Sequence, residues 1–149
     1  MKKQPILVSA CLLGVCCRYD GESKPCEIVI NLRENFILIP ICPEVDGGLP
    51  TPRIPSEIVG DKVLMRDGKD VTDNYRRGAE EALRLAKEYG CTAAVLKARS
   101  PSCGSNKIYD GSFSGVLTEG DGVCAKLLKE HGISVYTEEE TQLLLEKIT

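Results

Sequence analysis

The sequence predicts a single α/β domain over residues 1–149, with a mainly parallel sheet between two layers of helices. Two observations lead to this prediction. Short apolar runs of strand length alternate with segments of helical periodicity, which is typical of β-α-β units. The composition, 42% hydrophobic and 28% charged, is that of a globular chain, and we find no internal repeat, low-complexity tract or linker.

The first part of the chain reads as strand, helix, strand. Pro5–Ser9 is a short apolar run that predicts a buried first strand. Pro25 suits the first turn of a helix, and Phe36–Ile41 predicts a second strand. The apolar face of the helix is expected to consist of Ile28, Val29 and Leu32.

The next segment contains little regular structure in its sequence pattern. Five prolines between positions 40 and 55, with Gly47 and Gly48, predict a long irregular loop. Residues 57–71 contain short runs interrupted by polar residues around Gly60-Asp61 and Asp67-Gly68, which predict a hairpin.

A long helix is expected from Asp73 to Tyr89, capped by Thr72 or Asp73 and ended by Gly90. Its apolar stripe consists of Ala79, Ala82, Leu83 and Ala86. Ala93–Leu96 predicts a third strand, and a Ser/Pro/Gly loop leads from it to a short strand near Phe113.

The last part of the chain predicts helix, strand and helix. Val123–Glu130 is expected to be helical and to stop at Gly132, and Ile133–Tyr136 is expected to form a fourth strand. Thr137 and Glu140 have the spacing of a capping box, which predicts a final helix through Ile148.

Charge and hydropathy exclude several classes of protein. Nineteen Lys and Arg against 22 Asp and Glu give a net charge of −3, so no overall basic field favours a nucleic-acid polymer. No apolar stretch approaches the ~18 residues of a membrane span, and no signal peptide is recognisable. We therefore expect a cytoplasmic protein with a small-molecule partner, in which the eight cysteines do not form a disulfide framework.

Three cysteines follow the carboxyl ends of predicted strands. Cys11 lies two residues beyond Ser9, Cys42 directly follows Ile41, and Cys103 lies in the loop after Leu96. The carboxyl ends of parallel strands meet at one edge of a sheet, where open α/β sheets bind their ligands. The sequence therefore predicts a site with three thiolates, although each cysteine taken singly is also suited to packing as a small buried hydrophobe.

The other cysteines carry weaker signals. Cys91 and Cys124 are expected to fill the core, and Cys26 lies at a helix start, where a thiol can be either activated or simply packed. The adjacent Cys16 and Cys17 fit no zinc or thioredoxin spacing, but they can add a ligand or a redox partner.

The spacing of the cysteines is compatible with three uses of their thiols. A catalytic zinc ion would leave one position for water in a hydrolase, and an iron–sulfur cubane on three thiolates would leave one iron free to take a substrate. A noncatalytic sulfur or small-ligand carrier would use one cysteine as a persulfide. Spacing does not choose between zinc and iron.

Several ordered motifs distribute over nearly the whole chain. They are Ser9-Ala-Cys-Leu-Leu-Gly14, Arg18-Tyr-Asp-Gly21, Cys42-Pro-Glu-Val-Asp-Gly-Gly-Leu49, Pro52-Arg-Ile-Pro55, Gly68-Lys-Asp-Val-Thr72, Leu96-Lys-Ala-Arg-Ser-Pro-Ser-Cys-Gly104 and Tyr109-Asp-Gly-Ser-Phe113. Together they resemble the DUF523 family, which includes thiouracil desulfurase (desulfidase) enzymes.

The resemblance implies a Rossmann-like domain that carries a [4Fe-4S] cluster on three cysteines, matched here by Cys11, Cys42 and Cys103. It implies non-redox desulfuration of a thiolated nucleobase or similar thiocarbonyl compound, with release of sulfide. Glu44 matches an acid/base residue, and either Ser100 or Ser102 matches a hydroxyl that contacts the substrate.

Three basic residues in these motifs have alternative roles. Arg53 is expected either to pair with Glu57 or Asp46 or to orient a substrate carbonyl. Lys97 and Arg99 either balance the charge of a cluster or face solvent.

Overall fold

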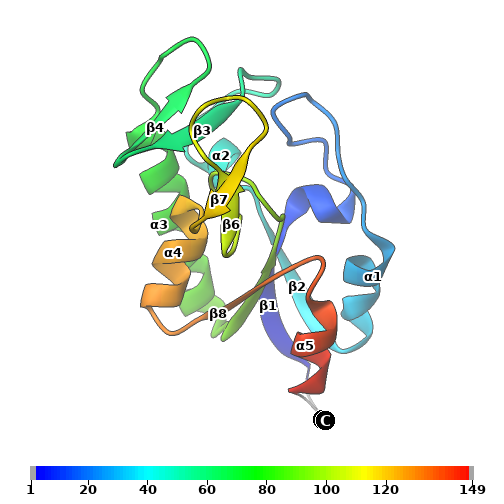
Figure 1. Ribbon diagram of the computed structural model, residues 1–149. Coiled ribbons are helices and arrows are strands. Elements are labelled where there is room, and N and C mark those ends of the chain that lie inside the picture. The colour runs from blue at the N-terminus through cyan, green and yellow to red at the C-terminus, as the bar shows by residue number, and fades with distance from the viewer. Residues whose placement is uncertain (1–2, 148–149) are drawn as a thin grey trace.

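A computed structural model describes residues 3–147 and shows a four-stranded parallel sheet in the order β2-β1-β5-β8. The four strands are β1 (Gln4–Ser9), β2 (Phe36–Ile41), β5 (Ala93–Leu96) and β8 (Ser134–Thr137). Figure 1 shows the sheet between two layers of helices. The mainly parallel three-layer α/β architecture predicted from the sequence is confirmed.

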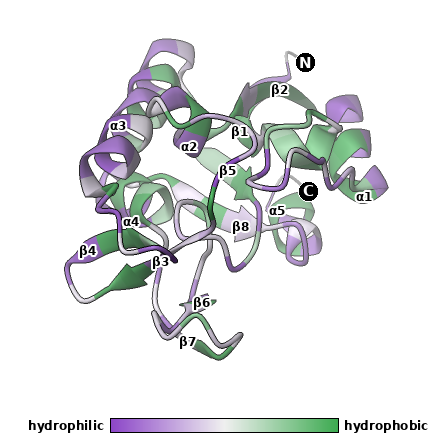
Figure 2. Ribbon diagram, turned by 90° about the horizontal axis from the view of Figure 1, so that it is seen from above, coloured by the Kyte–Doolittle hydropathy of each residue, from purple (hydrophilic) through white to green (hydrophobic). Residues whose placement is uncertain are grey.

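The two faces of the sheet bury different side chains. On one face, α3 (Thr72–Tyr89) and α4 (Val123–Glu130) pack against Leu7 and Leu96 through small residues of their buried stripes. On the other face, α1 (Glu27–Ile30), the 3₁₀ helix η2 (Asn31–Glu34) and α5 (Thr141–Glu146) cover Ile6 and Val8. Figure 2 shows the apolar residues gathered between these layers and polar residues on the outer side of α3. Successive β1 residues thus alternate between two cores.

Two hairpins lie above the carboxyl edge of the sheet (Figure 1). The first consists of β3 (Ser56–Val59) and β4 (Lys62–Met65), which confirms the predicted hairpin. The second consists of β6 (Lys107–Tyr109) and β7 (Leu117–Glu119). The prediction of a short strand near Phe113 is wrong. Phe113 lies in the loop that connects β6 to β7, and its φ is 57°.

The segment expected to be a long loop contains a one-turn helix, α2 (Pro43–Asp46). Pro43 occupies its first position, where a missing N–H costs nothing, and the Asp46 carboxylate accepts a hydrogen bond from the Cys42 amide at 3.2 Å. The remaining prolines do leave irregular structure between α2 and β3.

The helix expected from Pro25 is shorter than predicted and begins at Glu27. Its Ile-Val-Ile run is β-branched and favours helix weakly, so one α turn is followed by one 3₁₀ turn. Val29 and Leu32 are buried as expected, but Ile28 is 62% exposed because so short a helix presents only a narrow stripe to the sheet.

The ends of two helices also differ from expectation. Neither Thr72 nor Asp73 caps α3; instead Asp70 accepts hydrogen bonds from the amide and hydroxyl of Thr72, at 2.9 and 2.6 Å. Glu140 does bond the Thr137 amide at 2.9 Å, but this contact closes a turn, and α5 begins only at Thr141. The expected end at Ile148 lies outside the described residues. Among those residues, no helix is long and apolar enough to cross a bilayer.

Candidate functional site

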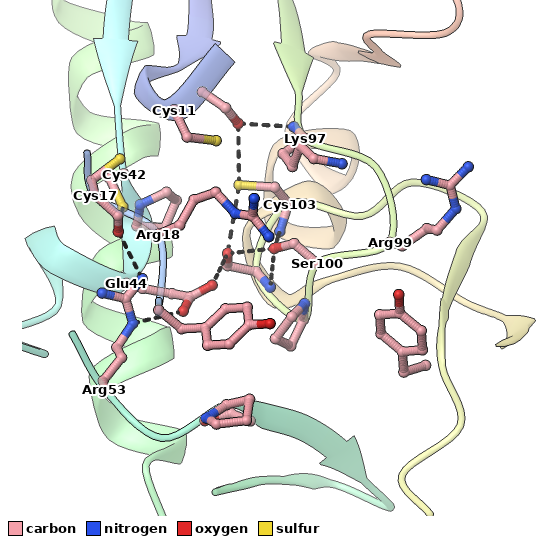
Figure 3. A pocket seen from close by; sticks show the side chains of 18 of the residues that line it. Cys11, Cys17, Arg18, Cys42, Glu44, Arg53, Lys97, Arg99, Ser100 and Cys103 are labelled. Atoms are coloured by element: carbon pink, nitrogen blue, oxygen red, sulfur yellow. Dashed lines mark hydrogen bonds and ion pairs between the residues drawn. The ribbon is translucent and has the colours of Figure 1, made fainter. Parts of the chain in front are cut away.

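A pocket of about 510 Å³ lies at the carboxyl edge of the sheet. Its floor is formed by the segments that follow β1, β2 and β5, and its upper wall by the β3–β4 hairpin and the loop between β6 and β7. Figure 3 shows many of its lining side chains, among them four cysteines.

The three cysteines predicted from strand ends all line this pocket. Cys11 lies in η1 (Ala10–Leu13), a 3₁₀ helix that directly continues β1. Cys42 lies between β2 and α2, and Cys103 lies in the loop after β5. Because β1 is paired with both β2 and β5, the three segments begin side by side. The predicted meeting of Cys11, Cys42 and Cys103 at one edge is therefore what the fold shows.

Cys103 is held by two hydroxyl groups. Its Sγ lies 3.4 Å from Ser9 Oγ and 3.5 Å from Ser102 Oγ. Burial raises the pKa of the Cys103 thiol to about 12. Ser9 Oγ also accepts a hydrogen bond from the Lys97 amide at 2.9 Å, which ties the ends of β1 and β5 together beneath the thiol.

A fourth cysteine, Cys17, completes the group. Its thiol hydrogen-bonds with the thiols of Cys11 and Cys42, and the bond with Cys11 is the main cause that raises the pKa of Cys17 to about 11. The hydrogen bond with Cys17, together with burial, raises the pKa of Cys42 well above its ordinary value. These raised pKa values favour the protonated thiols of Cys17 and Cys42, so metal binding there has to release protons.

Glu44 faces the same pocket from α2 and has a partner on each carboxylate oxygen. Arg53 Nε donates to Oε1 at 3.0 Å, and Ser102 Oγ donates to Oε2 at 3.0 Å. The Arg53 side chain is only 3% exposed, so this ion pair is shielded from water. The carboxylate is thereby oriented toward the loop that carries Ser102 and Cys103 (Figure 3).

The two candidate serines have different contacts. Ser100 Oγ accepts hydrogen bonds from the amides of Ser102 and Cys103, at 3.1 and 2.9 Å, which is the geometry of a loop-closing hydroxyl. Ser102 Oγ lies 2.9 Å from Ser100 Oγ and is the hydroxyl in contact with Glu44. Because a carboxylate only accepts, Ser102 donates to Glu44 and Ser100 donates to Ser102.

Arg53 does not pair with either partner expected from the sequence. Besides Glu44, it donates to the carbonyl of Pro50, to the Thr51 hydroxyl and to the carbonyl of Cys17, at 3.0, 3.1 and 2.9 Å. Its guanidinium thus joins the acidic residue to the loop that carries the fourth thiol. The fixed planar fork of arginine suits this arrangement.

Lys97 and Arg99 line the pocket but are neutralised from the chain segment after β8. Lys97 Nζ lies 2.8 Å from Glu138 Oε2, and Arg99 Nη2 lies 3.0 Å from Glu139 Oε2. Neither is a free surface cation.

Glu57 is a residue of the pocket wall that sequence reasoning did not assign to the site. It is 9% exposed and accepts hydrogen bonds from the amides of Gly111 and Phe113, at 2.9 and 3.2 Å. It therefore holds the β6–β7 loop against β3. No local pattern signals this role, since the partners are 54 and 56 positions away.

The donor chemistry of the pocket fits an iron–sulfur group. Within residues 3–147, no three His, Cys, Asp or Glu side chains are placed to hold a single metal ion. Four cysteines instead line a pocket of about 510 Å³, and soft sulfur ligands favour iron–sulfur clusters. Cys91 and Cys124, expected to fill the core, are buried beneath α3 and α4 with the core residues of that face.

Comparison with known proteins agrees with this geometry. A family model described as 2-thiouracil desulfurase matches residues 6–140. The chain belongs to this family. The matched range includes every lining residue of the pocket, from Ser9 to Gly115.

Two relatives of the family cover nearly the whole chain. A solved structure of TudS, a [4Fe-4S]-dependent thiouracil desulfidase, is 46% identical, covers 98% of both chains and has a TM-score of 0.93. The uncharacterised protein YbbK of Bacillus subtilis (strain 168) is 43% identical over 94% of this chain and 99% of its own length.

Proposed function

We propose that this chain removes sulfur from a thiolated nucleobase or similar thiocarbonyl compound without net redox change, using a [4Fe-4S] cluster held by Cys11, Cys42 and Cys103. The main support is the convergence of these three thiols with Glu44 in one pocket of a chain that matches a [4Fe-4S]-dependent thiouracil desulfidase over 98% of its length. Atoms balance as thiocarbonyl plus water giving carbonyl plus hydrogen sulfide.

When bound, the cluster supplies a Lewis-acidic iron with affinity for the substrate sulfur, which makes the attached carbon more open to attack by water. The protein supplies the proton transfers. Glu44 accepts a proton from the attacking water through the oxygen that faces Ser102, and returns one to the leaving sulfur.

Ser102 and Arg53 keep the Glu44 carboxylate in position during both transfers. One hydrogen bond at 3.0 Å to each oxygen fixes the plane of the carboxylate, so little reorientation is required during the reaction. Ser102 also contacts Cys103, which links the acid/base residue to one thiol of the cluster site.

The rival interpretations predict different chemistry. A zinc hydrolase needs three ligands around one ion, which the described residues do not offer. A sulfur carrier needs one reactive thiol, whereas burial and mutual hydrogen bonds raise the pKa of Cys17, Cys42 and Cys103.

The direct test is anaerobic reconstitution with iron and sulfide, followed by incubation with 2-thiouracil and no electron donor. We expect uracil and sulfide in equal amounts over many turnovers. A cluster-loaded protein that converts no thiolated base would overturn the desulfurase proposal. A stable sulfur adduct on one cysteine without turnover would favour a carrier, and stoichiometric zinc after reconstitution would favour a hydrolase.

A further inference from the structure

We propose that Arg18 selects the substrate by donating hydrogen bonds to a second carbonyl oxygen, which lies one ring atom away from the carbon that carries sulfur. This inference rests on the proposed function and narrows its substrate class. In both 2-thiouracil and 4-thiouracil, the two carbons that carry sulfur and oxygen flank the same ring nitrogen. A donor that binds this oxygen can therefore accept either isomer.

The guanidinium of Arg18 has few partners within the protein. The residue lines the pocket, and its side chain is only 22% exposed. Within residues 3–147, its ion pair with Asp20 joins Nη2 and Oδ2 at 3.6 Å, and its Cζ lies 5.7 Å from the centre of the Tyr19 ring. A guanidinium carries five N–H groups, and 3.6 Å is too long for a hydrogen bond. The donors of Arg18 are therefore left for a ligand.

The other cations that line the pocket are occupied by protein groups. Arg53 donates hydrogen bonds through all three of its side-chain nitrogens. Lys97 and Arg99 each face a carboxylate, at 2.8 and 3.0 Å. The Arg66 guanidinium lies over the ring of Phe113, 6.0 Å from its centre, in the upper wall of the pocket.

The direction of the Arg18 side chain fits a role in substrate binding. Figure 3 shows it extending into the pocket from the side of Cys42 toward Cys103 and Ser100. Glu44 lines the same pocket. A substrate that reaches the cysteines and Glu44 has to share this space with the Arg18 guanidinium.

The backbone that carries Arg18 is fixed by hydrogen bonds. The Arg18 amide donates to the Glu22 carbonyl at 3.2 Å, and the Gly21 amide donates to the Arg18 carbonyl at 2.9 Å. The next carbonyl, that of Tyr19, accepts a hydrogen bond from the Arg53 amide at 2.7 Å. A fixed backbone beneath unsatisfied donors is the arrangement that a preorganised binding residue requires.

The chemistry of arginine suits a neutral carbonyl oxygen. The guanidinium stays charged, and two of its N–H groups can reach the two lone pairs of one oxygen. The sequence left the orientation of a substrate carbonyl open for Arg53, but Arg53 is bound to Glu44 and to backbone carbonyls. A mostly buried donor also disfavours a ligand that lacks the acceptor, because the donor then stays unpaired.

The first test is the steady-state kinetics of 2-thiouracil desulfuration by the reconstituted wild type and Arg18→Gln. The proposed bonds form in the bound substrate and persist through the reaction, so KM should rise about 10- to 100-fold and kcat should change less than about threefold. The matched control, Arg76→Gln at an exposed position of α3, should behave as wild type. An unchanged KM, or a loss confined to kcat, overturns the inference.

A second variant keeps this test decisive if Arg18→Gln fails to fold or to load iron and sulfide. Arg18→Lys keeps the positive charge but lacks the planar fork, so KM should again rise with kcat preserved. Wild-type KM in Arg18→Lys, with Arg18→Gln unfolded, would assign the residue a structural role and overturn the inference.

The second test measures binding without turnover, by equilibrium dialysis of the reconstituted protein with uracil or pyrimidin-2-one. Pyrimidin-2-one lacks the second oxygen, so the wild type should bind uracil about tenfold or more tightly, and Arg18→Gln should bind both compounds equally. Equal binding of both compounds by the wild type, or binding of neither, overturns the inference. A preference for uracil that survives in Arg18→Gln, or that is lost in Arg66→Gln instead, also overturns it.

These outcomes separate the inference from the proposed function. A wild type that converts 2-thiouracil, with unchanged kinetics in Arg18→Gln, contradicts only the role of Arg18. A wild type that loads a cluster and prefers uracil through Arg18, but converts no thiolated base, contradicts the desulfurase proposal and not the recognition of the second oxygen.

Discussion

Glu44 is the side chain on which the proposed proton transfers depend. Its two oxygens are bound by Arg53 and Ser102, and α2 places it two residues after Cys42. The motif containing Cys42 and Glu44 identified this residue in the sequence. Its partners were not predictable, since Arg53 had several carboxylates within reach along the chain and Ser102 is 58 positions away.

We predict that Glu44→Gln keeps the cluster and loses turnover. The amide keeps the shape of the carboxylate but cannot accept the proton of water, so kcat should fall about 10²- to 10⁴-fold. Iron and labile sulfide content should stay at the wild-type level, which controls for a folding defect. Normal turnover by this variant would show that another group carries the proton.

Substitution of Ser102 should lower mainly the turnover rate, whereas substitution of Ser100 should lower mainly the stability. Ser102→Ala removes the donor to Glu44, and we expect kcat to fall about 10- to 100-fold with cluster content preserved. Ser100→Ala leaves the amides of Ser102 and Cys103 without their acceptor, at about 1–3 kcal/mol of stability.

The Ser100→Ala variant should therefore show a lower melting temperature and a faster loss of cluster than Ser102→Ala. Steady-state kinetics and thermal unfolding of the two variants measure the difference. The opposite ranking, with Ser100→Ala the worse catalyst and the more stable protein, would exchange the two roles.

At the scale of elements, α2 depends on a close approach to α3. A Cβ atom added at Gly78 would overlap the backbone carbonyl of Pro43, the first residue of α2. The stripe predicted from the sequence, Ala79, Ala82, Leu83 and Ala86, lies on the side of α3 that faces the core, but it did not include the buried Gly78, against which another backbone lies.

We predict that Gly78→Ala pushes α2 away from α3 and disturbs the segment that carries Cys42 and Glu44. Overpacking of this kind typically costs about 1–3 kcal/mol, and we expect a loss of both stability and cluster content. Glu80→Ala, at an exposed position of the same helix, is the control and should behave as wild type. Full cluster loading by Gly78→Ala would show that α2 tolerates the displacement.

Asp121 connects the β6–β7 hairpin to α4. Its Oδ1 accepts hydrogen bonds from the Asn106 amide and from Lys129 Nζ, both at 2.8 Å. Burial acts to raise the pKa of this carboxyl, but the bonds from Lys129 and Asn106 outweigh it and hold the pKa below the ordinary value of 3.8. A lowered pKa means that the folded state favours the ionised form.

The resulting stability is present above the unfolded pKa and is lost as pH falls through the folded one. We expect Asp121→Asn to lower the free energy of unfolding by about 1 kcal/mol at pH 7. In urea unfolding, the gap to wild type should shrink below about pH 4. Asp61→Asn, in the exposed turn between β3 and β4, should show no such gap. A gap that does not change with pH would exclude the charged contacts as its cause.

For the whole molecule, local patterns predicted the sheet and the main helices because strand runs and helical stripes depend on neighbouring residues. Ala93–Leu96 and the α3 stripe are examples. Contacts between distant segments were not predictable in the same way. Glu57 bonding the Phe113 loop and Cys17 bonding Cys11 and Cys42 depend on how loops fold over the sheet edge.

Cys11, Cys42 and Cys103 line one pocket for a topological reason. Parallel strands place their carboxyl ends at one edge of the sheet. The residues that follow β1, β2 and β5 therefore lie near one another regardless of the conformation of the loops. The same topology did not predict the Glu44, Ser102 and Arg53 contacts, since their geometry is set by α2 and two irregular loops.

The central claim is that Cys11, Cys42 and Cys103 hold the cluster, and iron analysis of single Cys→Ser variants tests it most directly. After anaerobic reconstitution, the account predicts about four iron and four labile sulfide per chain in the wild type and in Cys91→Ser and Cys124→Ser, whose thiols lie in the core. It predicts little or no stable cluster in Cys11→Ser, Cys42→Ser or Cys103→Ser. Wild-type iron and sulfide content in any of those three variants would contradict it.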